Sequence, residues 1–212
     1  MRTLLIESTP GAGAAASAML AAAEHSVVRC HEADTPSFPC AALTDPLACP
    51  LAGPTPADVV VVARAHTDAA PTAAEAGVSC AIKLGIPVVV LAPMGANPFE
   101  GFATSAGSEY PPEACEQAVD AAHERTVAPL RAEVVRMLEA GGLADAAGSV
   151  TVDFERDGTR VQIDVEVPHD SPVEPETIAT HVRDRFRATA PAGLATATVT
   201  DVSVHTSPPP EA

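Results

Sequence analysis

Hydrophobic positions in the first 92 residues form continuous runs, whereas those beyond residue 149 alternate with polar positions. The early runs are short, rich in valine, leucine and isoleucine, and separated by alanine-rich or mixed segments. Such runs separated by helices are typical of a parallel sheet buried on both faces. We therefore predict a small doubly wound α/β domain, with strands at 3–7, 26–30, 58–63 and 87–92 and helices at 12–24 and near Cys80.

In the second half of the chain, the spacing of apolar residues changes twice. Residues 113–140 carry apolar side chains at helical spacing, with a kink or break expected at Pro129. Residues 150–154 and 161–167 then alternate apolar with polar positions on either side of a turn at 156–159, which predicts an antiparallel hairpin with one buried face. A helix at 174–189 and a final strand at 197–205 complete the pattern of an α+β domain.

Proline and glycine set the expected boundaries. They are concentrated in residues 93–112, which we interpret as a linker between a domain at 1–92 and a domain at 113–206. The segment 207–212 contains three prolines, and we expect a disordered tail there.

Composition and charge exclude some classes of binding partner. The 212 residues are 47% apolar, which is enough for a core, but there is no Trp, one Tyr and five Phe. The chain therefore lacks a set of aromatic rings on which nucleic-acid bases could stack. Its formal charge of −16 repels phosphate backbones and anionic lipid surfaces. We expect no nucleic-acid partner and no direct membrane insertion.

The apolar stretches also bear on localisation. The N-terminal run is too short for a signal peptide, and the longest runs fall well short of the roughly 20 residues that a membrane-spanning helix needs. We therefore expect a cytoplasmic protein, in which thiols stay reduced. An odd count of five cysteines in that compartment favours a metal, a cluster or a reactive thiol over a disulfide framework.

Four of these cysteines lie in the first 80 residues, and three of them occur in a proline-broken loop at 30–57. We take Cys30, Cys40, Cys49 and Cys80 as candidate ligands of zinc or an iron–sulfur cluster, with His31 as an alternative ligand. The intervening gaps of nine, eight and thirty residues differ from the C-x2-C pairs of common zinc modules. A redox-active thiol pair and purely structural cysteines therefore remain open alternatives.

The carboxyl ends of parallel strands meet at one edge of a sheet, which is where such folds bind ligands. Residues 9–13, the Cys30–His31 pair and residues 66–68 would all leave strands at that edge. Cys80 would join them if Ser79 caps a short helix and leaves the thiol in its first turn, where the helix terminus favours a thiolate. Cys115 opens a later helix and is interpreted as structural.

The segment from Gly11 to Ala16 has the loose form G-x-G-x-x-A after a strand, with Glu32 in the place of a ribose-binding acid. We take Gly11 and Gly13 as candidate residues of a nucleotide site, which would belong to a Rossmann-like enzyme. Thr9 and Pro10 form an equally good helix start, with a capping hydroxyl before proline at the first helical position.

The N-terminal domain also looks like a response-regulator receiver in its order of strands. However, the first strand ends in Glu7-Ser8 instead of an acidic pair, and the third ends in Ala63-Arg64-Ala65 with no aspartate to accept a phosphoryl group. No lysine follows the fourth strand. The resemblance is therefore to a degenerate receiver-like scaffold, and a scaffold does not supply a function.

The C-terminal half combines a strand pair at 150–154 and 161–167, a helix at 178–186, a Gly193-Leu194 pair and a strand at 199–204. In these features, over roughly the last 95 residues, it resembles the alkaline-shock protein family of bacteria. Two features depart from the family pattern: the N-terminal helix is only loosely echoed by 130–143, and Ala190-Pro191-Ala192 replaces the usual turn. The resemblance implies a non-enzymatic protein linked to envelope stress.

Three hypotheses follow for the whole chain. The leading one is a non-catalytic, stress-associated bacterial protein that self-associates or binds a protein partner, with no catalytic residues. His169, His181 and His205 match no metal or acid–base motif and support this interpretation. The second is a metal- or thiol-based redox sensor that uses the cysteines. The third is a nucleotide-binding enzyme.

Overall fold

The computed structural model of the chain describes residues 1–31, 40–65, 70–91, 97–106, 110–143, 145–157, 160–191, 194 and 198–207. The chain divides into two compact units, Met1–Ala122 and His123–Ala212. The prediction of mixed α/β architecture is confirmed, with a parallel sheet in the first unit and a mixed sheet in the second.

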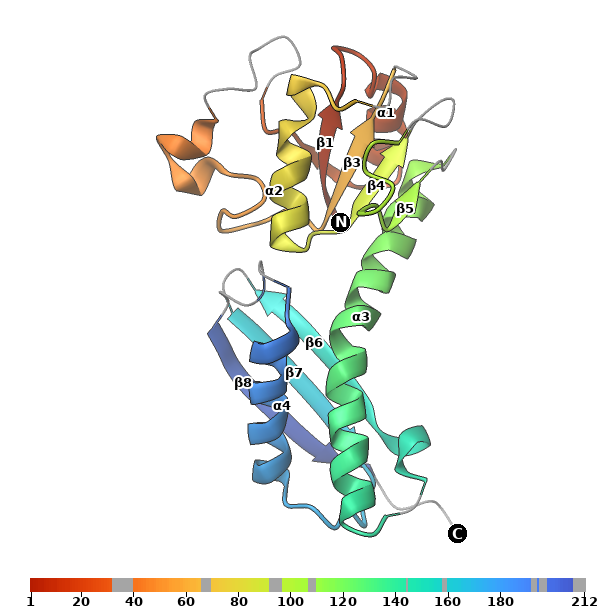
Figure 1. The fold of residues 1–212 in the computed structure, drawn as a ribbon, viewed down its shortest axis with the longest axis vertical. Helices are drawn as coiled ribbons and strands as arrows, with labels where there is room; N and C mark the ends of the chain where they lie inside the picture. The colour runs from red at the N-terminus through yellow and green to blue at the C-terminus, as the bar shows by residue number, and fades with distance from the viewer. Residues whose placement is uncertain are drawn as a thin grey trace. The chain divides into compact units, whose positions relative to one another are not determined.

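The first unit contains a five-stranded sheet with the order β2-β1-β3-β4-β5, in which all pairs are parallel (Figure 1). The strands are β1 (Arg2–Glu7), β2 (Ser26–Val28), β3 (Val59–Ala63), β4 (Val88–Leu91) and β5 (Ser105–Ala106). The continuous apolar runs thus form a parallel sheet, as predicted. Connections between parallel strands need crossovers, and helices supply two of them.

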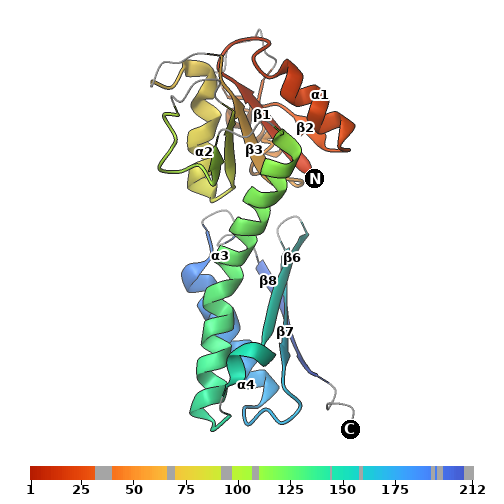
Figure 2. The ribbon, with the colours of Figure 1, turned by 90° about the vertical axis from the view of Figure 1, so that its right-hand side faces the viewer.

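Helices cover both faces of this sheet. Helix α1 (Ala14–Ala22) and helix α2 (Ala76–Leu84) lie on opposite sides of the strands (Figure 2). Val60 and Val62 pack with α2, whereas Val59 and Val61 pack with α1 and with the first turns of α3 (Pro111–Ala140). Every residue of β3 is therefore buried, which explains why its sequence shows no alternation.

The boundary between the units differs from the expected linker at 93–112. Within that segment, Ser105–Ala106 pairs with β4, and Phe99 is buried in the core of the first unit. Ala114, Cys115 and Ala118 of α3 also pack against this sheet. Residues 92–96 and 107–109 lie outside the described residues.

The units divide inside α3, between Ala122 and His123. This 30-residue helix continues through Pro129, where a kink or break was predicted. The proline removes one backbone hydrogen bond without ending the helix. We predicted a linker from the proline and glycine content, which reflects only the local conformation of the backbone. The boundary depends instead on which of the two hydrophobic cores the side chains of each turn of α3 pack into.

The second unit contains a three-stranded sheet with the order β6-β7-β8. Strands β6 (Thr151–Asp157) and β7 (Arg160–Val167) form the predicted antiparallel hairpin. Helix α4 (Pro175–Thr189) then leads to β8 (Thr198–Thr206), which pairs parallel to β7. The predicted helix and final strand are confirmed. Ser207, the first residue of the predicted disordered tail, is held by its N–H, which donates to the carbonyl of Val167 over 2.8 Å; residues 208–212 lie outside the described residues.

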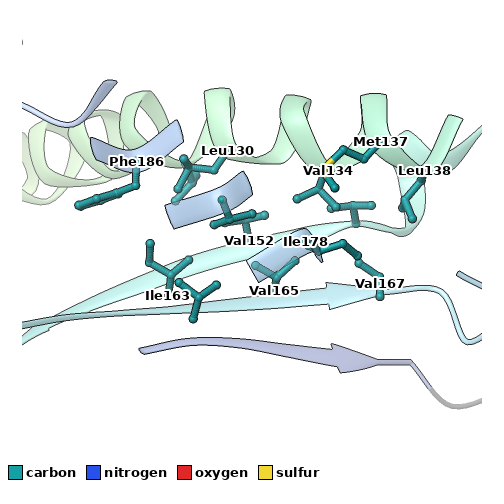
Figure 3. Packing of buried hydrophobic residues seen from close by; sticks show 14 of the residues in the cluster. Leu130, Val134, Met137, Leu138, Val152, Ile163, Val165, Val167, Ile178 and Phe186 are labelled. Carbon is teal, nitrogen blue, oxygen red and sulfur yellow. The ribbon is translucent and has the colours of Figure 1, made fainter. Parts of the chain in front are cut away.

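One face of this second sheet carries the core. Leu130, Val134 and Leu138 of α3 pack over the strands from one side (Figure 3). Ile178, Val182 and Phe186 of α4 join the same cluster. Both helices therefore cover the same face, as Figure 2 shows. The opposite face carries the polar half of the alternating pattern, and its side chains are exposed or half-buried.

Candidate functional site

The order of strands in the first sheet places its switch point between β1 and β3. From β1 the chain moves to β2 on one side and to β3 on the other. In open α/β sheets, ligands bind outside the carboxyl ends of the strands at such a point. The candidate residues Cys30 and His31 and the glycines of 11–13 follow strands that end at this edge, as predicted.

A small pocket opens beside the carboxyl end of β1. It is lined by Glu7, Pro10, Arg29, Cys30 and His31, together with Leu5, Ile6 and Ala74. Its volume of about 40 Å³ is room for a few water molecules or an ion. Pockets for drug-sized ligands measure roughly 300 Å³ or more, so this one does not enclose a dinucleotide.

Glu7 occupies the turn that was predicted to bind a nucleotide phosphate. The Gly13 N–H donates to Oε1 of Glu7 over 2.7 Å, and the other carboxylate oxygen lies 3.6 Å from Nε of Arg29. Gly13 precedes the first residue of α1, so this N–H is one that a bound anion would use. The nearly buried carboxylate also places negative charge there.

Both glycines have a structural reason to be glycine. Gly11 has φ +84°, a conformation that other residues rarely adopt. A Cβ atom at Gly13 would come within 2.9 Å of Leu5 and 3.1 Å of Glu7. Glu32 lies outside the described residues. The nucleotide site at Gly11 and Gly13 stays a prediction, and the Glu7 contact weighs against it.

A buried ion pair lies at the same edge and was not anticipated from the sequence. The Nε of Arg64, which follows β3, lies 2.8 Å from Oε1 of Glu75, and both side chains are fully buried. The contact is a charge pair without the geometry of a linear hydrogen bond. Arg64 also donates from Nη2 to the Ala70 carbonyl over 2.8 Å.

Backbone and hydroxyl groups extend this pair to β1. The Thr72 N–H donates to Oε2 of Glu75 over 2.6 Å, and the Thr72 hydroxyl donates to the Ser8 carbonyl over 3.2 Å. The hydroxyl of Ser8 in turn accepts from the Ala65 N–H over 3.0 Å. These bonds hold both ends of the connection from β3 to α2. Within that connection, residues 66–69, which include the candidate residues 66–68, lie outside the described residues.

One local signal could have located part of this network. Thr72 and Glu75 form a capping box, in which each side chain binds the other's backbone, and the sequence pattern Thr-x-x-Glu announces such a box. No local pattern links Glu75 to Arg64, which lies before the intervening loop.

The other three candidate cysteines lie close enough to Cys30 to influence the charge of its thiol. Burial, and after it the thiols of Cys49, Cys40 and Cys80, together raise the pKa of the Cys30 thiol to about 12. Cys30 and Cys49 also pack against the same hydrophobic cluster on the α2 side of the sheet. These cysteines are up to 50 positions apart in the sequence, which left open whether they approach one another. Glu7, Arg29 and His31 line the same small pocket as Cys30.

Cys80 reaches this group from a different position than predicted. Helix α2 starts at Ala76, so Cys80 is its fifth residue and not in a first turn capped by Ser79. The capping box at Thr72 starts the helical segment earlier. Gly77 lies inside this helical segment and does not break it. A Cβ atom at Gly77 would come 3.1 Å from Ile6 and 3.4 Å from the Cys30 sulfur, so the close packing there favours glycine. The helix-terminus argument therefore does not apply to Cys80, which is exposed.

The thiols are near one another but are not arranged around a metal ion. Within the described part of the chain, which includes all five cysteines, no group of three or more His, Cys, Asp or Glu side chains is placed to hold one. Cys40 is exposed, Cys49 is half-buried, and two short 3₁₀ helices, η1 (Ala41–Leu43) and η2 (Pro46–Ala48), separate them. Zinc or cluster binding at Cys30, His31, Cys40, Cys49 and Cys80 therefore stays a prediction, and it requires this segment to rearrange.

Cys115 is separate from this group. It is fully buried against the other face of the sheet, beside Ala114 and Ala118. Burial and, to a lesser degree, Glu116 raise the pKa of its thiol to about 12. It therefore serves as a small apolar core residue, which agrees with its interpretation as structural.

The four histidines of the second unit lie beside carboxylates at its surface, and His123, whose Nε2 is 2.9 Å from Oδ1 of Asp153, also stacks on the ring of Phe154. His205 Nε2 is 3.8 Å from Asp164, His181 Nδ1 is 3.5 Å from Glu133, and His169 Nδ1 is 4.0 Å from Asp170. Exposed pairs of this kind contribute little to stability. They do not converge on one another, and they provide no acid–base arrangement among the described residues.

None of the helices in the described residues combines the length and the apolar character required to cross a membrane. The chain matches no protein-family model, and no curated protein matches it either.

Proposed function

We propose that this chain is a non-catalytic bacterial binding protein, associated with envelope stress, that self-associates or binds a protein partner through its C-terminal unit in the cytoplasm. The observation that carries the proposal is the half-covered sheet of that unit. Both of its helices pack on one face, and the other face and the edges of the three strands carry polar side chains and backbone groups available to a partner. The resemblance of residues 113–206 to the alkaline-shock proteins supports the same role.

Charge restricts how this unit associates with itself. On the open face, Asp153 lies directly opposite Asp164, and Glu155, Glu166 and Asp201 occupy the same face. Two such faces brought together would stack carboxylates against carboxylates, which is unfavourable. Self-association therefore uses an edge of the sheet or the helical side.

The test is the molar mass of the full chain across a wide concentration range, measured by sedimentation equilibrium. We expect a reversible rise above the mass of 21.5 kDa as concentration increases. A mass that stays monomeric up to millimolar concentration would remove self-association from the proposal. The variant Phe102→Ser is a suitable control, because Phe102 is an exposed apolar residue of the first unit and its loss should leave the association unchanged.

A second function is favoured by the cysteines around Cys30. Ionised thiols close to one another repel, so the charged form of the group is stabilised when a cation lies between them, whereas joining two thiols as a disulfide removes the charges altogether. Either event would change the segment 40–57, because Cys40 and Cys49 belong to it. We propose on this basis a thiol-based sensor, with zinc or an iron–sulfur cluster as the candidate ligand.

Its disulfide form can be written with a defined oxidant. Hydrogen peroxide takes two electrons from two thiols, one S–S bond forms, and two water molecules are released. Exposed Cys40 or Cys80 would attack the peroxide and be oxidised first, because the raised pKa keeps Cys30 protonated at neutral pH.

Two measurements separate these possibilities. Metal and sulfide content, with an absorption spectrum, would be determined on protein purified without oxygen, and peptide mass spectrometry after mild peroxide treatment would locate any disulfide. We expect either about one metal site per chain that is lost in Cys49→Ser, or a disulfide within the group of four. Cys115→Ser is the matched control and should change neither. Metal-free protein with all four thiols still reduced would exclude the sensor.

A further inference from the structure

The second sheet has two edges, and they differ in how well they match a second copy of the chain. Among the described residues, β6 and β8 are each paired on one side only. An unpaired strand edge presents a row of backbone N–H and C=O groups that can pair with another strand. β8 is nine residues long, which is ample for such pairing.

The backbone of β8 indicates which of its groups point outward. The Ser207 N–H donates to the Val167 carbonyl, so residue 207 faces β7. Backbone groups alternate in direction along a strand. Val202, Val204 and Thr206 therefore direct their N–H and C=O groups away from β7, toward the open edge.

Side chains select one register for pairing with a second copy. If two β8 strands pair antiparallel around a two-fold axis at Ser203, Val202 of each lies opposite Val204 of the other. Val202 and Val204 are the residues with outward backbone groups, so each such pair exchanges both of its hydrogen bonds. The same register places Asp201 opposite His205 on the open face, twice in the dimer. Both side chains are exposed.

Other registers lose this complementarity. An axis at residue 201 would place Asp201 against itself, and an axis at 205 would do the same for His205. The edge of β6 is worse: an axis at Asp153 pairs that aspartate with itself, and an axis at Phe154 pairs Asp153 with Glu155 twice. Like charges directly opposite one another in a sheet are destabilising. In a chain with a formal charge of −16, such pairs add to a repulsion that is already present.

We propose that the edge strand β8 is the interface through which two copies of this chain associate, antiparallel and centred on Ser203, to form a continuous six-stranded sheet. The inference rests on the proposed self-association and specifies its partner and its contact. Within one chain, Nε2 of His205 already lies 3.8 Å from Oδ1 of Asp164. Asp201 of the second copy adds a further carboxylate beside the same imidazole. Ser203, which donates to Asp201 over 3.3 Å, lies on the two-fold axis.

A charge swap tests this register on the full chain. His205→Asp places aspartate opposite aspartate at two points of the dimer, and Asp201→His places histidine opposite histidine. We expect each single variant to raise the dimer dissociation constant by about tenfold, measured by sedimentation equilibrium. The double variant Asp201→His with His205→Asp restores opposite partners, and its dissociation constant should return to within a few-fold of the parent value.

The double variant is also its own folding control. It carries the same new aspartate beside Asp164 as the single variant, so damage within one chain would persist while the intermolecular pair is restored. His181→Asp replaces a surface histidine of α4 that lies beside Glu133 of α3, and this variant should leave the dimer dissociation constant unchanged. If the parent chain dimerises but the single and double variants behave alike, the β8 register is wrong while self-association stands. If the parent is monomeric throughout, the proposed self-association itself fails.

Discussion

The two sheets of this chain use hydrophobic residues in opposite ways. In the first unit both faces of the sheet are buried, so polar groups are confined to the ends of the strands. In the second unit one face is buried and the other is open, so polar side chains occupy every second position along the strands. The difference determines where function can be located: at the carboxyl edge of the first sheet and along the open face and edges of the second.

Burial also changes the chemistry of the groups at these two places. At the edge of the first sheet, Arg64 and Glu75 are removed from water and paired, and Cys30 is held protonated. On the open face of the second sheet, Glu166 accepts hydrogen bonds from the hydroxyls of Ser207 and Thr151, which lower the pKa of its carboxyl. We therefore expect substitution of the buried polar groups at the edge of the first sheet to lower the free energy of unfolding strongly. Substitution of the polar groups on the open face of the second sheet should change it little.

The buried ion pair offers the largest expected effect. Glu75→Ala leaves the Arg64 guanidinium buried without its partner, and we expect a loss of about 3–5 kcal/mol in the free energy of unfolding. Chemical denaturation followed by circular dichroism measures this loss. Glu133→Ala, which removes the carboxylate of a more exposed pair with Arg136, should cost less than about 1 kcal/mol. Equal costs for the two variants would contradict the contrast between the units.

Neighbouring positions along one strand test the burial pattern directly. Val60 and Val61 lie on opposite faces of β3, and both faces are part of a hydrophobic core. Val60→Ala and Val61→Ala should therefore each lower the free energy of unfolding by about 2 kcal/mol. On β7, Ile163→Ala should cost about 2–5 kcal/mol. Gln162→Ala should stay within about 0.5 kcal/mol, since Gln162 lies on the open face. A large cost at Gln162 would show that this face is covered in solution.

His25 predicts a pH dependence for the first unit. Burial lowers the pKa of its imidazole, and the N-terminal amine lowers it further, while Glu116 and Asp58 act in the opposite direction. The folded state therefore binds this proton less readily than the unfolded state does. Its stabilising contribution is complete above the ordinary histidine pKa of roughly 6.5 and is lost as pH falls toward the lower folded value.

The measurement is the free energy of unfolding between pH 7.5 and pH 5. His25→Gln should give a flatter profile than the parent over this range. His169→Gln is the control in the second unit, where the imidazole is exposed, and it should leave the slope unchanged. A parent profile with no slope in this range would contradict the assignment.

The smallest expected effect concerns the glycine turn. Because Glu7 already accepts from the Gly13 N–H, we expect millimolar adenine nucleotides to leave the melting temperature of the chain unchanged. Glu7→Gln removes the negative charge, so a latent phosphate site would appear in this variant as a nucleotide-dependent rise in melting temperature. A rise in the parent chain would support the nucleotide site and show that Glu7 moves aside.

Much of the secondary structure was predictable because it depends on local periodicity. The runs at β1, β3 and β4 and the alternation at β6 and β7 are visible in short windows, and the structure places these elements within a few residues of their predicted bounds. The common edge shared by Cys30, His31 and the glycines of 11–13 could also be expected in outline, since parallel strands end there. The relative placement of Cys40 and Cys49 could not, because it depends on the path of the chain between them.

The sequence by itself determined the two kinds of sheet, since the spacing of apolar residues decides how many faces of a strand can be buried. The tertiary structure alone decided that α3 joins both cores, that Glu7 occupies the glycine turn and that Arg64 pairs with Glu75. These outcomes depend on contacts between segments far apart in the chain. Their energies come from desolvation and charge pairing at the assembled edge, and no local window of residues contains them.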